Sequence, residues 1–373
     1  MKAVFLANRT FGIVSSRLTI IRKLIDFGWD VTILANRDNT SEKLGTMGCK
    51  VIDIPFASGG FNFYKDSKSY FKLKHTLKLI RPELIHNFNA KPVILGTFLG
   101  RSTCGPKTRI VNTITGLGYA YLKGGLTQYV SNLAYSKLLD SADLNIFQND
   151  SDKNRFVSSK FVSSKKAITI VSSGVDIRKF KPNPVASLPK EITIVFVGRL
   201  LWQKGIREFL EAATRLKKQN VKLKFLVYGE LAEKHPDGVP KNYLDQFEKQ
   251  SIARINGFTD NIENVYSNCN LLVFPSYYGE GVPRVVLEAA ACGIPAVVCQ
   301  AGWVNGVVLD GETGFVVEPK SPNAIVNAVQ KFLDNRELFI KMGQKAATHV
   351  KENFDQKNIV EKYMQIYEQF SQL

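Results

Sequence analysis

The chain has 373 residues, which is long enough for two domains that each bury a core of their own. Its composition, 45% hydrophobic and 22% charged, is that of a globular protein and excludes a disordered or fibrous chain. No stretch is long and apolar enough to predict a transmembrane helix, and the first residues look like a strand rather than a signal peptide.

The net charge of +17 is distributed unevenly. Residues 1–180 contain 27 Lys and Arg against 12 Asp and Glu, whereas residues 181–373 contain 23 against 21. A strongly basic first half indicates an anionic partner, for which a membrane surface, a lipid phosphate and a nucleic acid all qualify. The five cysteines are scattered without a CxxC pair, which is typical of reduced thiols in the cytoplasm, and no zinc-type ligand spacing occurs.

Apolar segments of strand length alternate with helical patterns along the chain. In the first half, strands are expected at residues 3–7, 31–34, 51–54, 84–86, 110–113, 144–147 and 168–170. In the second half, they are expected at residues 192–197, 223–228, 252–256, 271–274, 295–298 and near 315–317. Helical patterns lie between them, for example at 17–27, 126–139 and 206–218. This alternation predicts an α/β fold with parallel sheets covered on both faces.

A proline-rich, polar segment at residues 180–189 has the composition of a linker. We therefore expect two doubly wound, Rossmann-like domains, over residues 1–180 and from 181 onward, with a cleft between them.

A basic amphipathic pattern covers residues 63–80 of the first half. Tyr70, Leu73, Leu77 and Ile80 share one helical face, and Lys68, Lys72, Lys74 and Lys78 are spread around the rest. Such a helix is suited to lie on an anionic membrane. It is equally typical of a Rossmann-type helix with a core stripe and a solvated face, and the two descriptions are compatible.

Glycines flank aromatic residues after the strand at 110–113. Gly116 and Gly118 would let the backbone approach a ligand closely, and tyrosines 119, 121 and 129 would suit a lipid interface. The alternative is a glycine loop whose tyrosines pack on the next helix. As a nucleotide site it is weak, because Tyr121 stands where a dinucleotide fingerprint needs glycine and no Walker A sequence is present.

Two cations follow the strand at 192–197. That strand ends in Gly198-Arg199, and Lys204-Gly205 precedes a helical pattern. Arg199 and Lys204 thus stand on a strand-to-helix turn, where α/β sheets bind their ligands. They suit a diphosphate and would offset the charge that builds on a departing nucleotide diphosphate. Taken alone, this turn would favour two solvated surface cations.

Two carboxylates, Glu280 and Glu288, are separated by seven residues. The apolar strand at 271–274 ends in a turn, and a helix is expected to begin near Pro283, since proline suits a first helical turn. Arg284 in that turn opposes the helix dipole, and an anion bound by Arg284 and the free N–H groups would remove the conflict. An ordinary junction with a surface arginine is the alternative.

Together these segments resemble the retaining GT-B glycosyltransferases of family 4. The Gly-Arg…Lys-Gly turn and the Glu-x7-Glu motif of that family both occur here, and the resemblance covers nearly the whole chain. Residues 173–180 are similar to the interdomain motif of the family, and residues 310–315 to a turn late in its sequences. The resemblance implies an acceptor-binding domain over 1–180, a nucleotide-sugar donor domain over 181–355 and a helix over 356–373 that crosses back to the first domain.

The same resemblance implies roles for individual residues in donor binding. Glu280, Arg199 and Lys204 would be catalytic, with the two cations on the donor diphosphate and Glu280 on the donor sugar. Glu288 would bind the ribose hydroxyls. The rest of the donor site would comprise Gly198, Gly281, Val282, Pro283 and Arg284. A pair of carboxylates also suggests hydrolase chemistry. The family instead retains configuration by front-face attack, in which a leaving phosphate oxygen helps to take the acceptor proton, so binding roles are preferred.

Residues 86–92 and 112–125 resemble a narrower branch of family 4. Its enzymes add a sugar, often an N-acetylhexosamine, to polyprenyl-diphosphate-linked sugars, such as undecaprenyl-linked ones, in the assembly of bacterial surface polysaccharide, lipopolysaccharide or N-glycan. The residues implied for the acceptor are Arg9, Gly12, Arg17, His86, Lys91, Gly116 and Gly118, with the cations meeting its phosphates. Phe88 stands where many members have a second histidine. Asn8 to Gly12 is expected to be a loop at the cleft.

The expected protein is a cytoplasmic enzyme, peripheral on the inner face of the bacterial inner membrane, that uses a UDP-HexNAc donor and no obligatory metal or other cofactor. Asp150-Ser151-Asp152 is formally a DxD metal–nucleotide motif of another glycosyltransferase fold, but helix capping by Asp150 or Ser151 is the simpler account. The alternatives are a soluble acceptor, a nucleotide-sugar 2-epimerase of the same fold, and a nucleic-acid binder. The last is disfavoured because no recognised nucleic-acid motif is present.

Overall fold

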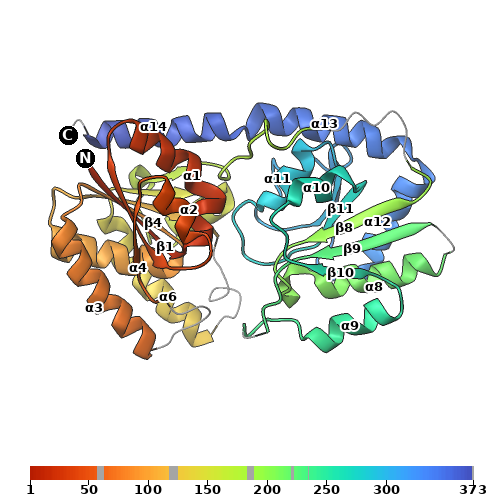
Figure 1. The fold of residues 1–373 in the computed structure, drawn as a ribbon, viewed down its shortest axis with the longest axis horizontal. Helices are drawn as coiled ribbons and strands as arrows, with labels where there is room; N and C mark the ends of the chain where they lie inside the picture. The colour runs from red at the N-terminus through yellow and green to blue at the C-terminus, as the bar shows by residue number, and fades with distance from the viewer. Residues whose placement is uncertain (57–62, 117–124, 183–188, 220–221, 234, 372–373) are drawn as a thin grey trace. The chain divides into compact units, whose positions relative to one another are not determined.

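The computed structural model describes residues 1–56, 63–116, 125–182, 189–219, 222–233 and 235–371 (Figure 1). Contacts divide the chain into two units. The first comprises Met1–Ser173, Gly279–Val282 and Lys357–Leu373, and the second comprises Gly174–Tyr278 and Pro283–Gln356. The boundary proposed at residue 180 therefore stands a little way inside the second unit.

The first unit contains a parallel sheet of seven strands in the order β3-β2-β1-β4-β5-β6-β7. These are β1 (Lys2–Arg9), β2 (Asp30–Asn36), β3 (Lys50–Asp53), β4 (Leu84–Phe88), β5 (Arg109–Ile114), β6 (Leu144–Phe147) and β7 (Ala167–Thr169). All seven predicted strands are confirmed. They could be found because strands buried on both faces of a parallel sheet appear as short continuous apolar runs.

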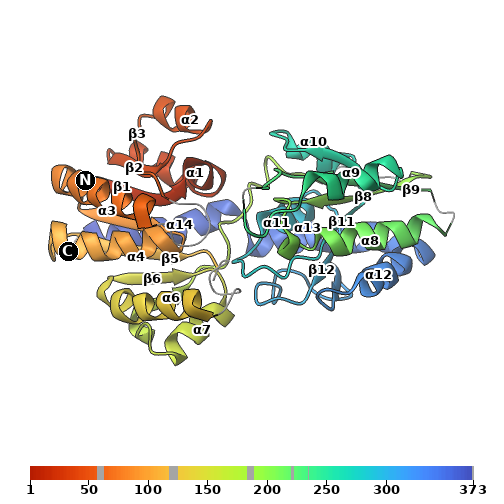
Figure 2. The same cartoon turned by 90° about the horizontal axis from the view of Figure 1, so that it is seen from below.

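Helices cover both faces of this sheet (Figures 1 and 2). Along β1 the side chains alternate: Ala3 and Phe5 pack with α1 (Thr10–Asp26), α2 (Ser41–Thr46) and α14 (Gln356–Ser371), whereas Val4 and Leu6 pack with α3 (Phe63–Ile80) and α4 (Ala90–Leu99). The α3–α4 face continues through α6 (Gly125–Leu138). A further helix, α7 (Asp150–Ser158), contacts β6 and β7, and a π-helical turn (Gly100–Cys104) and two short 3₁₀ turns complete the unit.

The helix at the C-terminal end of the chain belongs to the first unit, as the GT-B resemblance implies. α14 buries Ile359, Val360, Tyr363, Met364 and Tyr367 in the core of that unit. Their spacing of one, three and four residues places them on a single helical stripe. The N-terminal sheet is thus covered on one face by residues from the far end of the sequence.

The first helix begins earlier than its sequence pattern suggests. Asn8 to Gly12 is not a loop, because β1 continues to Arg9 and α1 starts at Thr10. The Asp38 carboxylate explains the early start: it accepts a hydrogen bond from the Phe11 N–H at 3.1 Å and one from the Thr10 hydroxyl at 2.7 Å. A side chain from the segment after β2 therefore caps α1, which periodicity within the helix cannot reveal.

The second unit contains a parallel sheet of six strands in the order β10-β9-β8-β11-β12-β13. These are β8 (Ile192–Val197), β9 (Leu223–Tyr228), β10 (Arg254–Gly257), β11 (Leu271–Phe274), β12 (Ala296–Cys299) and β13 (Gly314–Val317), again as predicted. On one face α8 (Ile206–Lys217) packs with α12 (Pro322–Asp334), and on the other α11 (Arg284–Ala291) packs with α13 (Glu337–Asn353). Two shorter helices, α9 (Lys241–Lys249) and α10 (Ile262–Ser267), lie at its edges.

A ladder of buried asparagines crosses the first sheet. Asn87 of β4 donates a hydrogen bond to Asn112 of β5 at 2.9 Å, and Asn112 donates to Asn145 of β6 at 2.9 Å. All three are fully buried and stand in register on neighbouring strands. Such a row is satisfied only when the strands are aligned in this register, because each buried amide needs its neighbour as a partner.

Each sheet has a switch point, where the strand order reverses direction from the first strand of the unit. It lies between β1 and β4 in the first unit and between β8 and β11 in the second. In open α/β sheets, ligands bind outside the carboxyl ends of the strands at this point. Among the helices that the structure describes, none is long and apolar enough to cross a membrane.

Candidate functional site

The two segments predicted to bind the donor meet at the switch point of the second sheet. β8 and β11 are hydrogen-bonded neighbours, so the turn after β8 lies beside the segment after β11. The Tyr277 N–H donates to the Gln203 carbonyl at 3.1 Å, and the Tyr277 hydroxyl donates to the Trp202 carbonyl at 3.2 Å. These bonds fix the two segments against each other, although they are far apart in the sequence.

Glycine is required where this turn passes close to other backbone. Gly205, the N-cap residue of α8, has a φ of +78°, and a Cβ there would overlap the Pro275 carbonyl oxygen. A Cβ at Gly229, the residue after β9, would likewise overlap the Gly198 carbonyl oxygen. The turns after β8, β9 and β11 are therefore packed closely at one edge of the sheet.

The two predicted diphosphate cations differ in how firmly they are held. Lys204 is only 8% exposed, and its Nζ lies 5.3 Å from the ring centroids of both Phe274 and Tyr278. The faces of aromatic rings attract a cation, so these rings hold the ammonium at the end of β11. Arg199 is exposed by contrast. It lies close enough to His235 that, after burial, its charge is the second cause of a lowered pKa of that imidazole.

Arg284 and Glu288 form an ion pair on α11. Pro283 is the N-cap residue, Arg284 is the first helical residue, and Glu288 lies one turn later. An Arg284 guanidinium nitrogen lies 2.6 Å from a carboxylate oxygen of Glu288, whose side chain is 9% exposed. The pair supplies the counter-charge that the sequence analysis assigned to a bound anion, so the fold does not need an anion to accommodate Arg284.

One polar atom of that pair is left over. The Arg284 Nε is buried and has no hydrogen-bond partner among the described residues. Only one carboxylate oxygen of Glu288 is engaged by Arg284. The pair therefore keeps a donor and an acceptor beyond its own bond.

Glu280, Gly281 and Val282 are grouped by contacts with the first unit. Within that unit the Gly281 N–H donates to the Thr115 carbonyl at 2.9 Å. Gly116 has a φ of +114°, and a Cβ there would lie 2.5 Å from the carbonyl carbon of Glu280. The structure thus brings together Glu280, predicted for the donor, and Gly116, predicted for the acceptor.

Three of the predicted acceptor residues lie at the switch point of the first sheet. Arg9 ends β1, Gly12 is exposed in the first turn of α1, and Lys91 is in the first turn of α4. Both cations already have carboxylate partners: Arg9 pairs with Asp38 at 3.3 Å, and Lys91 with Asp66 at 2.8 Å. An acceptor phosphate would have to share them.

Arg17 and His86 lie inside the first unit, which does not fit the direct acceptor contact expected of them. The guanidinium carbon of Arg17 lies 4.9 Å from the Phe88 ring centroid, and the residue is 2% exposed. His86 is fully buried, with Nδ1 2.5 Å from the Tyr367 hydroxyl and Nε2 2.7 Å from the Thr113 hydroxyl. Arg17 lies on the same buried stripe of α1 as Ile13 and Leu24, and α14 covers β4.

The environment of His86 keeps its imidazole neutral. Burial is the first cause that holds the pKa of His86 well below its usual range, and the charge of Arg17 is the second. Phe88, which replaces the second histidine of many relatives, stacks on His86 with ring centroids 4.1 Å apart and is itself buried. This part of β4 is a core rather than a binding surface.

The Asp150-Ser151-Asp152 sequence opens α7, as expected, but neither Asp150 nor Ser151 caps it. The cap is Asn149, whose side chain accepts a hydrogen bond from the Asp152 N–H at 2.7 Å. Asp150 instead accepts a bond from the Thr169 hydroxyl at 2.6 Å. Among the residues described, no group of three or more His, Cys, Asp or Glu could hold a metal ion. Gly118 and its neighbouring tyrosines 119 and 121 lie outside the described residues.

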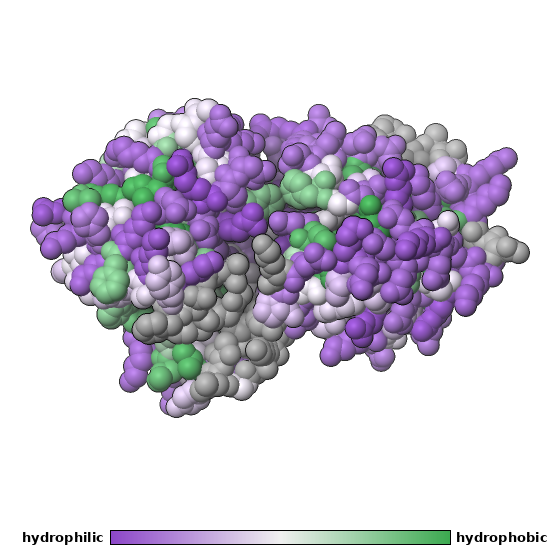
Figure 3. All heavy atoms as spheres, turned by 60° about the horizontal axis from the view of Figure 1, so that its bottom comes forward, coloured by the Kyte–Doolittle hydropathy of each residue, from purple (hydrophilic) through white to green (hydrophobic). Residues whose placement is uncertain are grey.

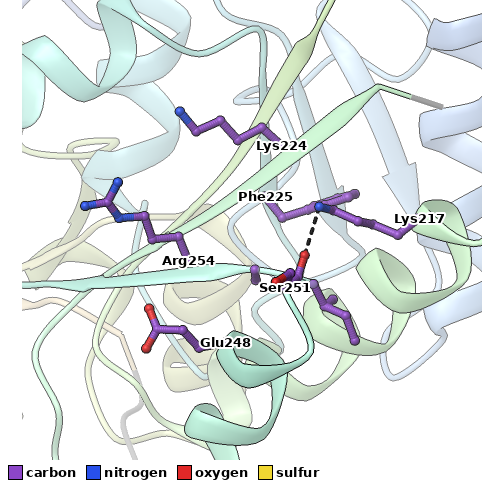
Figure 4. A pocket seen from close by; sticks show the side chains of 8 residues that line it. Lys217, Lys224, Phe225, Glu248, Ser251 and Arg254 are labelled. Atoms are coloured by element: carbon purple, nitrogen blue, oxygen red, sulfur yellow. Dashed lines mark hydrogen bonds between the residues drawn. The ribbon is translucent and has the colours of Figure 1, made fainter. Parts of the chain in front are cut away.

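A hollow on the second unit lies away from this edge (Figure 4). It is lined by residues at the starts of β9 and β10 and the ends of α8 and α9, which is the amino edge of the sheet: Lys217, Lys224, Phe225, Glu248, Ser251, Ile252, Ala253 and Arg254. The Lys217 ammonium is bonded to the Ser251 carbonyl at 2.9 Å, and Glu248 accepts a bond from the Ile255 N–H at 3.2 Å. These polar groups bind neighbouring backbone and do not converge as a ligand site.

Sequence reasoning missed the residues that support Lys204. Tyr278 and Phe274 hold its ammonium, and Gly229 brings a third strand end to the same edge. A signal for Gly229 was present, because the strand at 223–228 ends in a glycine as the strand at 192–197 does. The ring contacts had no such signal, since they depend on which strands are neighbours.

The chain is similar to known proteins over most of its length. Residues 3–149 match the family described as glycosyl transferase 4-like, and residues 177–349 match the glycosyl transferases group 1. The N,N'-diacetylbacillosaminyl-diphospho-undecaprenol alpha-1,3-N-acetylgalactosaminyltransferase of Campylobacter jejuni is 27% identical over 99% of this chain and 98% of its own. The UDP-Gal:alpha-D-GlcNAc-diphosphoundecaprenol alpha-1,3-galactosyltransferase of Escherichia coli is 25% identical over 84% of this chain and 82% of its own.

Solved structures show the same architecture. Sucrose-phosphate synthase from Thermosynechococcus elongatus superposes with a TM-score of 0.80 at 20% identity, covering 99% of both chains. Anabaena Alr3699/HepE in complex with UDP and glucose superposes with a TM-score of 0.79 at 18% identity, covering 100% of both chains. Two parallel Rossmann-like sheets with a helix that returns to the first unit define the GT-B fold. The chain belongs to the group 1 glycosyltransferases of family 4, a retaining family.

Proposed function

We propose that this glycosyltransferase moves an N-acetylhexosamine from a UDP-sugar to a polyprenyl-diphosphate-linked saccharide in the assembly of a bacterial surface glycan. The observation that carries the proposal is the similarity, over almost the full length of both chains, to an enzyme named for N-acetylgalactosamine transfer to an undecaprenyl-diphosphate-linked sugar. The galactosyltransferase of Escherichia coli is also named for a diphosphoundecaprenol acceptor, which supports the acceptor class more strongly than the sugar.

The donor would bind at the carboxyl edge of the second sheet. Lys204 and Arg199 would neutralise its diphosphate, with the close turn at Gly198 beside them. Glu288 would use its second carboxylate oxygen for the ribose hydroxyls, while Arg284 holds the first. Glu280 and the backbone of Gly281, Val282 and Pro283 would contact the sugar.

The reaction itself would proceed by front-face attack. The bond between the anomeric carbon and the diphosphate oxygen breaks, and its electron pair stays on the diphosphate. An acceptor hydroxyl oxygen forms the new bond on the same face of the sugar and passes its proton to a phosphate oxygen. Because Lys204 is fixed before the reaction, it can stabilise the developing negative charge without reorganisation.

On the acceptor side, we propose that Arg9, Gly12, Lys91 and Gly116 lie along the path of the lipid-linked saccharide. Arg17 and His86 would not contact the acceptor and would instead support this surface by holding β4 and α14 together. We place the protein on the cytoplasmic face of the inner membrane as a peripheral enzyme, and we propose that it needs no metal because protein cations neutralise the diphosphate.

The test is a panel of UDP- and GDP-sugars incubated with the purified chain, with and without polyprenyl-diphosphate-linked saccharide in detergent, in the presence of EDTA. We expect nucleotide diphosphate release that depends on the lipid-linked acceptor and is unaffected by EDTA. Equal release with a short water-soluble sugar would show that the acceptor is a soluble saccharide rather than a lipid-linked one. Isomerisation of the donor without any acceptor would identify an epimerase. Glu280→Ala should be nearly inactive, and near-normal transfer by that variant would exclude the proposed role of Glu280.

A further inference from the structure

Helix α3 has two faces of different character. Its inner face, which includes Leu73 and Leu77, is buried against β1, β4 and β5. The apolar stripe seen in the sequence is therefore part of the core and is not available to a membrane. The outer face carries a second set of large apolar side chains, Tyr64, Phe71 and Leu79, which are 76%, 67% and 70% exposed.

Cations alternate with these apolar residues on the outer face. Tyr64, Lys68, Phe71, His75 and Lys78 follow one another at spacings of three and four residues, so they form one line along the helix, and all five are exposed. The helix contains five lysines and a single acidic residue, Asp66. Asp66 is turned toward α4, where it pairs with Lys91 at 2.8 Å. The line itself therefore carries positive charge with no carboxylate within it.

Neighbouring helices extend this surface. α3, α4 and α6 pack their inner sides on the same face of the sheet, so their outer sides point in the same direction. Phe98 of α4 is 43% exposed, and its ring is 6.4 Å from that of Tyr70 on α3. Tyr129 and Leu133, one turn apart on α6, are 67% and 51% exposed. Figure 3, which brings this side forward, shows hydrophobic residues among hydrophilic ones on the first unit.

We propose that the outer face of α3, extended by Phe98, Tyr129 and Leu133, docks the first unit on an anionic phospholipid bilayer. Aromatic rings suit the boundary between headgroups and acyl chains, and lysines beside them attract anionic headgroups. A nucleic acid is the other polyanion that a basic surface could bind. Leu79 and Leu133 favour the bilayer, because aliphatic side chains neither stack on bases nor bond to phosphates.

The biological use of this surface rests on the proposed function, since a polyprenyl-linked acceptor resides in a membrane. The docking itself does not depend on catalysis. It can therefore be measured with lipid alone, on the full chain, without any donor or acceptor.

The first experiment is co-sedimentation with vesicles of phosphatidylglycerol mixed with phosphatidylcholine, and with vesicles of phosphatidylcholine alone. We expect the native chain to bind the anionic vesicles preferentially. The double variant Tyr64→Ser/Phe71→Ser should lower the partition coefficient on the order of tenfold, because it removes both aromatic anchors. The matched control is Phe27→Ser, which replaces an equally exposed ring (65%) at the end of α1, on the opposite face of the sheet.

The contribution of charge is tested by reversing lysines. Lys68→Glu/Lys78→Glu should abolish the preference for anionic vesicles, and added salt should weaken native binding. The control Lys43→Glu/Lys362→Glu changes the net charge of the protein by the same amount. Its substitutions lie on α2 and α14, which cover the other face of the sheet, so it should have little effect on vesicle binding. Equal loss in both charge variants, no vesicle binding by the native chain, or binding to single-stranded RNA in place of vesicles would overturn the proposal.

A second readout separates docking from catalysis. The Tyr64→Ser/Phe71→Ser variant should transfer sugar normally to a lipid-linked acceptor in detergent micelles and poorly to the same acceptor in anionic vesicles. Equal loss in both settings would show that these residues serve the reaction rather than docking. If the native chain transfers sugar in neither setting, the proposed function fails, and the vesicle measurement still decides the docking surface.

Discussion

Lys204 is held differently from the cations around it. Its ammonium is buried between the rings of Phe274 and Tyr278, whereas Arg207, on the next turn, is exposed and lies over the Trp202 ring at 4.6 Å. A cation fixed at the carboxyl edge of the sheet can act on a diphosphate bound there, and a cation on the outer surface of α8 cannot.

This contrast leads to a prediction about activity. Lys204→Met, which keeps most of the side-chain volume, should lower kcat/KM about 10²–10³-fold, the usual effect of removing one group that stabilises developing charge. Arg207→Met should leave it nearly unchanged. Nucleotide diphosphate release measures both, and a thermal unfolding scan checks that both variants are folded. Equal activity of the two variants would contradict the role of Lys204.

His86 leads to a prediction about stability and pH. The folded protein keeps His86 neutral, because burial and then the charge of Arg17 lower its pKa, whereas the unfolded chain takes up a proton below its ordinary pKa of 6.5. The unfolded state then binds more protons than the folded state at low pH. The contribution of His86 to the free energy of unfolding is therefore fully present above about pH 6.5 and is lost as the pH drops below that value.

Urea unfolding at several pH values between about 7.5 and 5 measures this effect. His86→Gln should lower stability at neutral pH but flatten the pH dependence in this window. His75→Gln, which replaces an exposed histidine of α3, should keep the native dependence. If the free energy of unfolding of the His86→Gln variant falls with pH as steeply as that of the native chain, groups other than His86 cause the pH dependence.

The α4 helix and the β4 strand fit together only because α4 contains a glycine. A Cβ at Gly96 would overlap the Asn87 Oδ1 and the Leu6 side chain. Asn87 cannot move aside without breaking its bond to Asn112 and disturbing the row of amides across the sheet. The small residue of the helix and the buried amide of the strand thus form one packing unit.

We expect Gly96→Ala to destabilise the protein by about 1–3 kcal/mol, as overpacking does. Gly45→Ala is the matched control, because it lies in α2 with nothing within 4 Å of the added Cβ, and it should be neutral or stabilising by up to about 1 kcal/mol. The free energy of unfolding in urea compares the two. A neutral Gly96→Ala would mean that Asn87 has room to move.

The elements that the sequence predicts correctly are those with a local cause. Most strands contain a short apolar run, and α3 and α14 follow their apolar stripes. The start of α1 at Thr10 has no local signal, because the Asp38 carboxylate that caps it comes from another part of the chain. The Arg284–Glu288 pair had a local signal, the four-residue spacing of opposite charges, which gives Arg284 a counter-charge on its own helix. The burial of His86 depends on α14 and has no local signal.

The first unit is completed by residues from both ends of the sequence. Tyr363 and Tyr367 of α14 are fully buried beside β1 and β4, and the Tyr367 hydroxyl bonds to His86. The second unit is formed by the chain between these two parts. Stability of the N-terminal sheet therefore depends on the C-terminal helix, while the second unit has its own core.

Tyr367→Ala should destabilise the first unit by about 3–5 kcal/mol, the usual cost of removing a buried aromatic ring. Hydrogen exchange should show faster exchange of β1 and β4 amides while β8 and β11 remain protected. Met342 is a buried residue of α13, and Met342→Ala should speed the exchange of β8 and β11 amides while β1 and β4 remain protected. Parallel loss of protection in both units after Tyr367→Ala would show that the two unfold together.

The return of α14 to the first unit also has a consequence for how the protein is made. A ribosome delivers residues 1–173 first, but α14 emerges only after residues 174–356 have been synthesised. At about 5–20 residues per second, that delay is roughly 10–40 s. During this time the apolar face of β1, β2 and β4 lacks part of its cover. The nascent chain should therefore offer a binding site to chaperones until α14 has left the ribosome, and a chain that stalls before residue 356 should be recognised as incomplete.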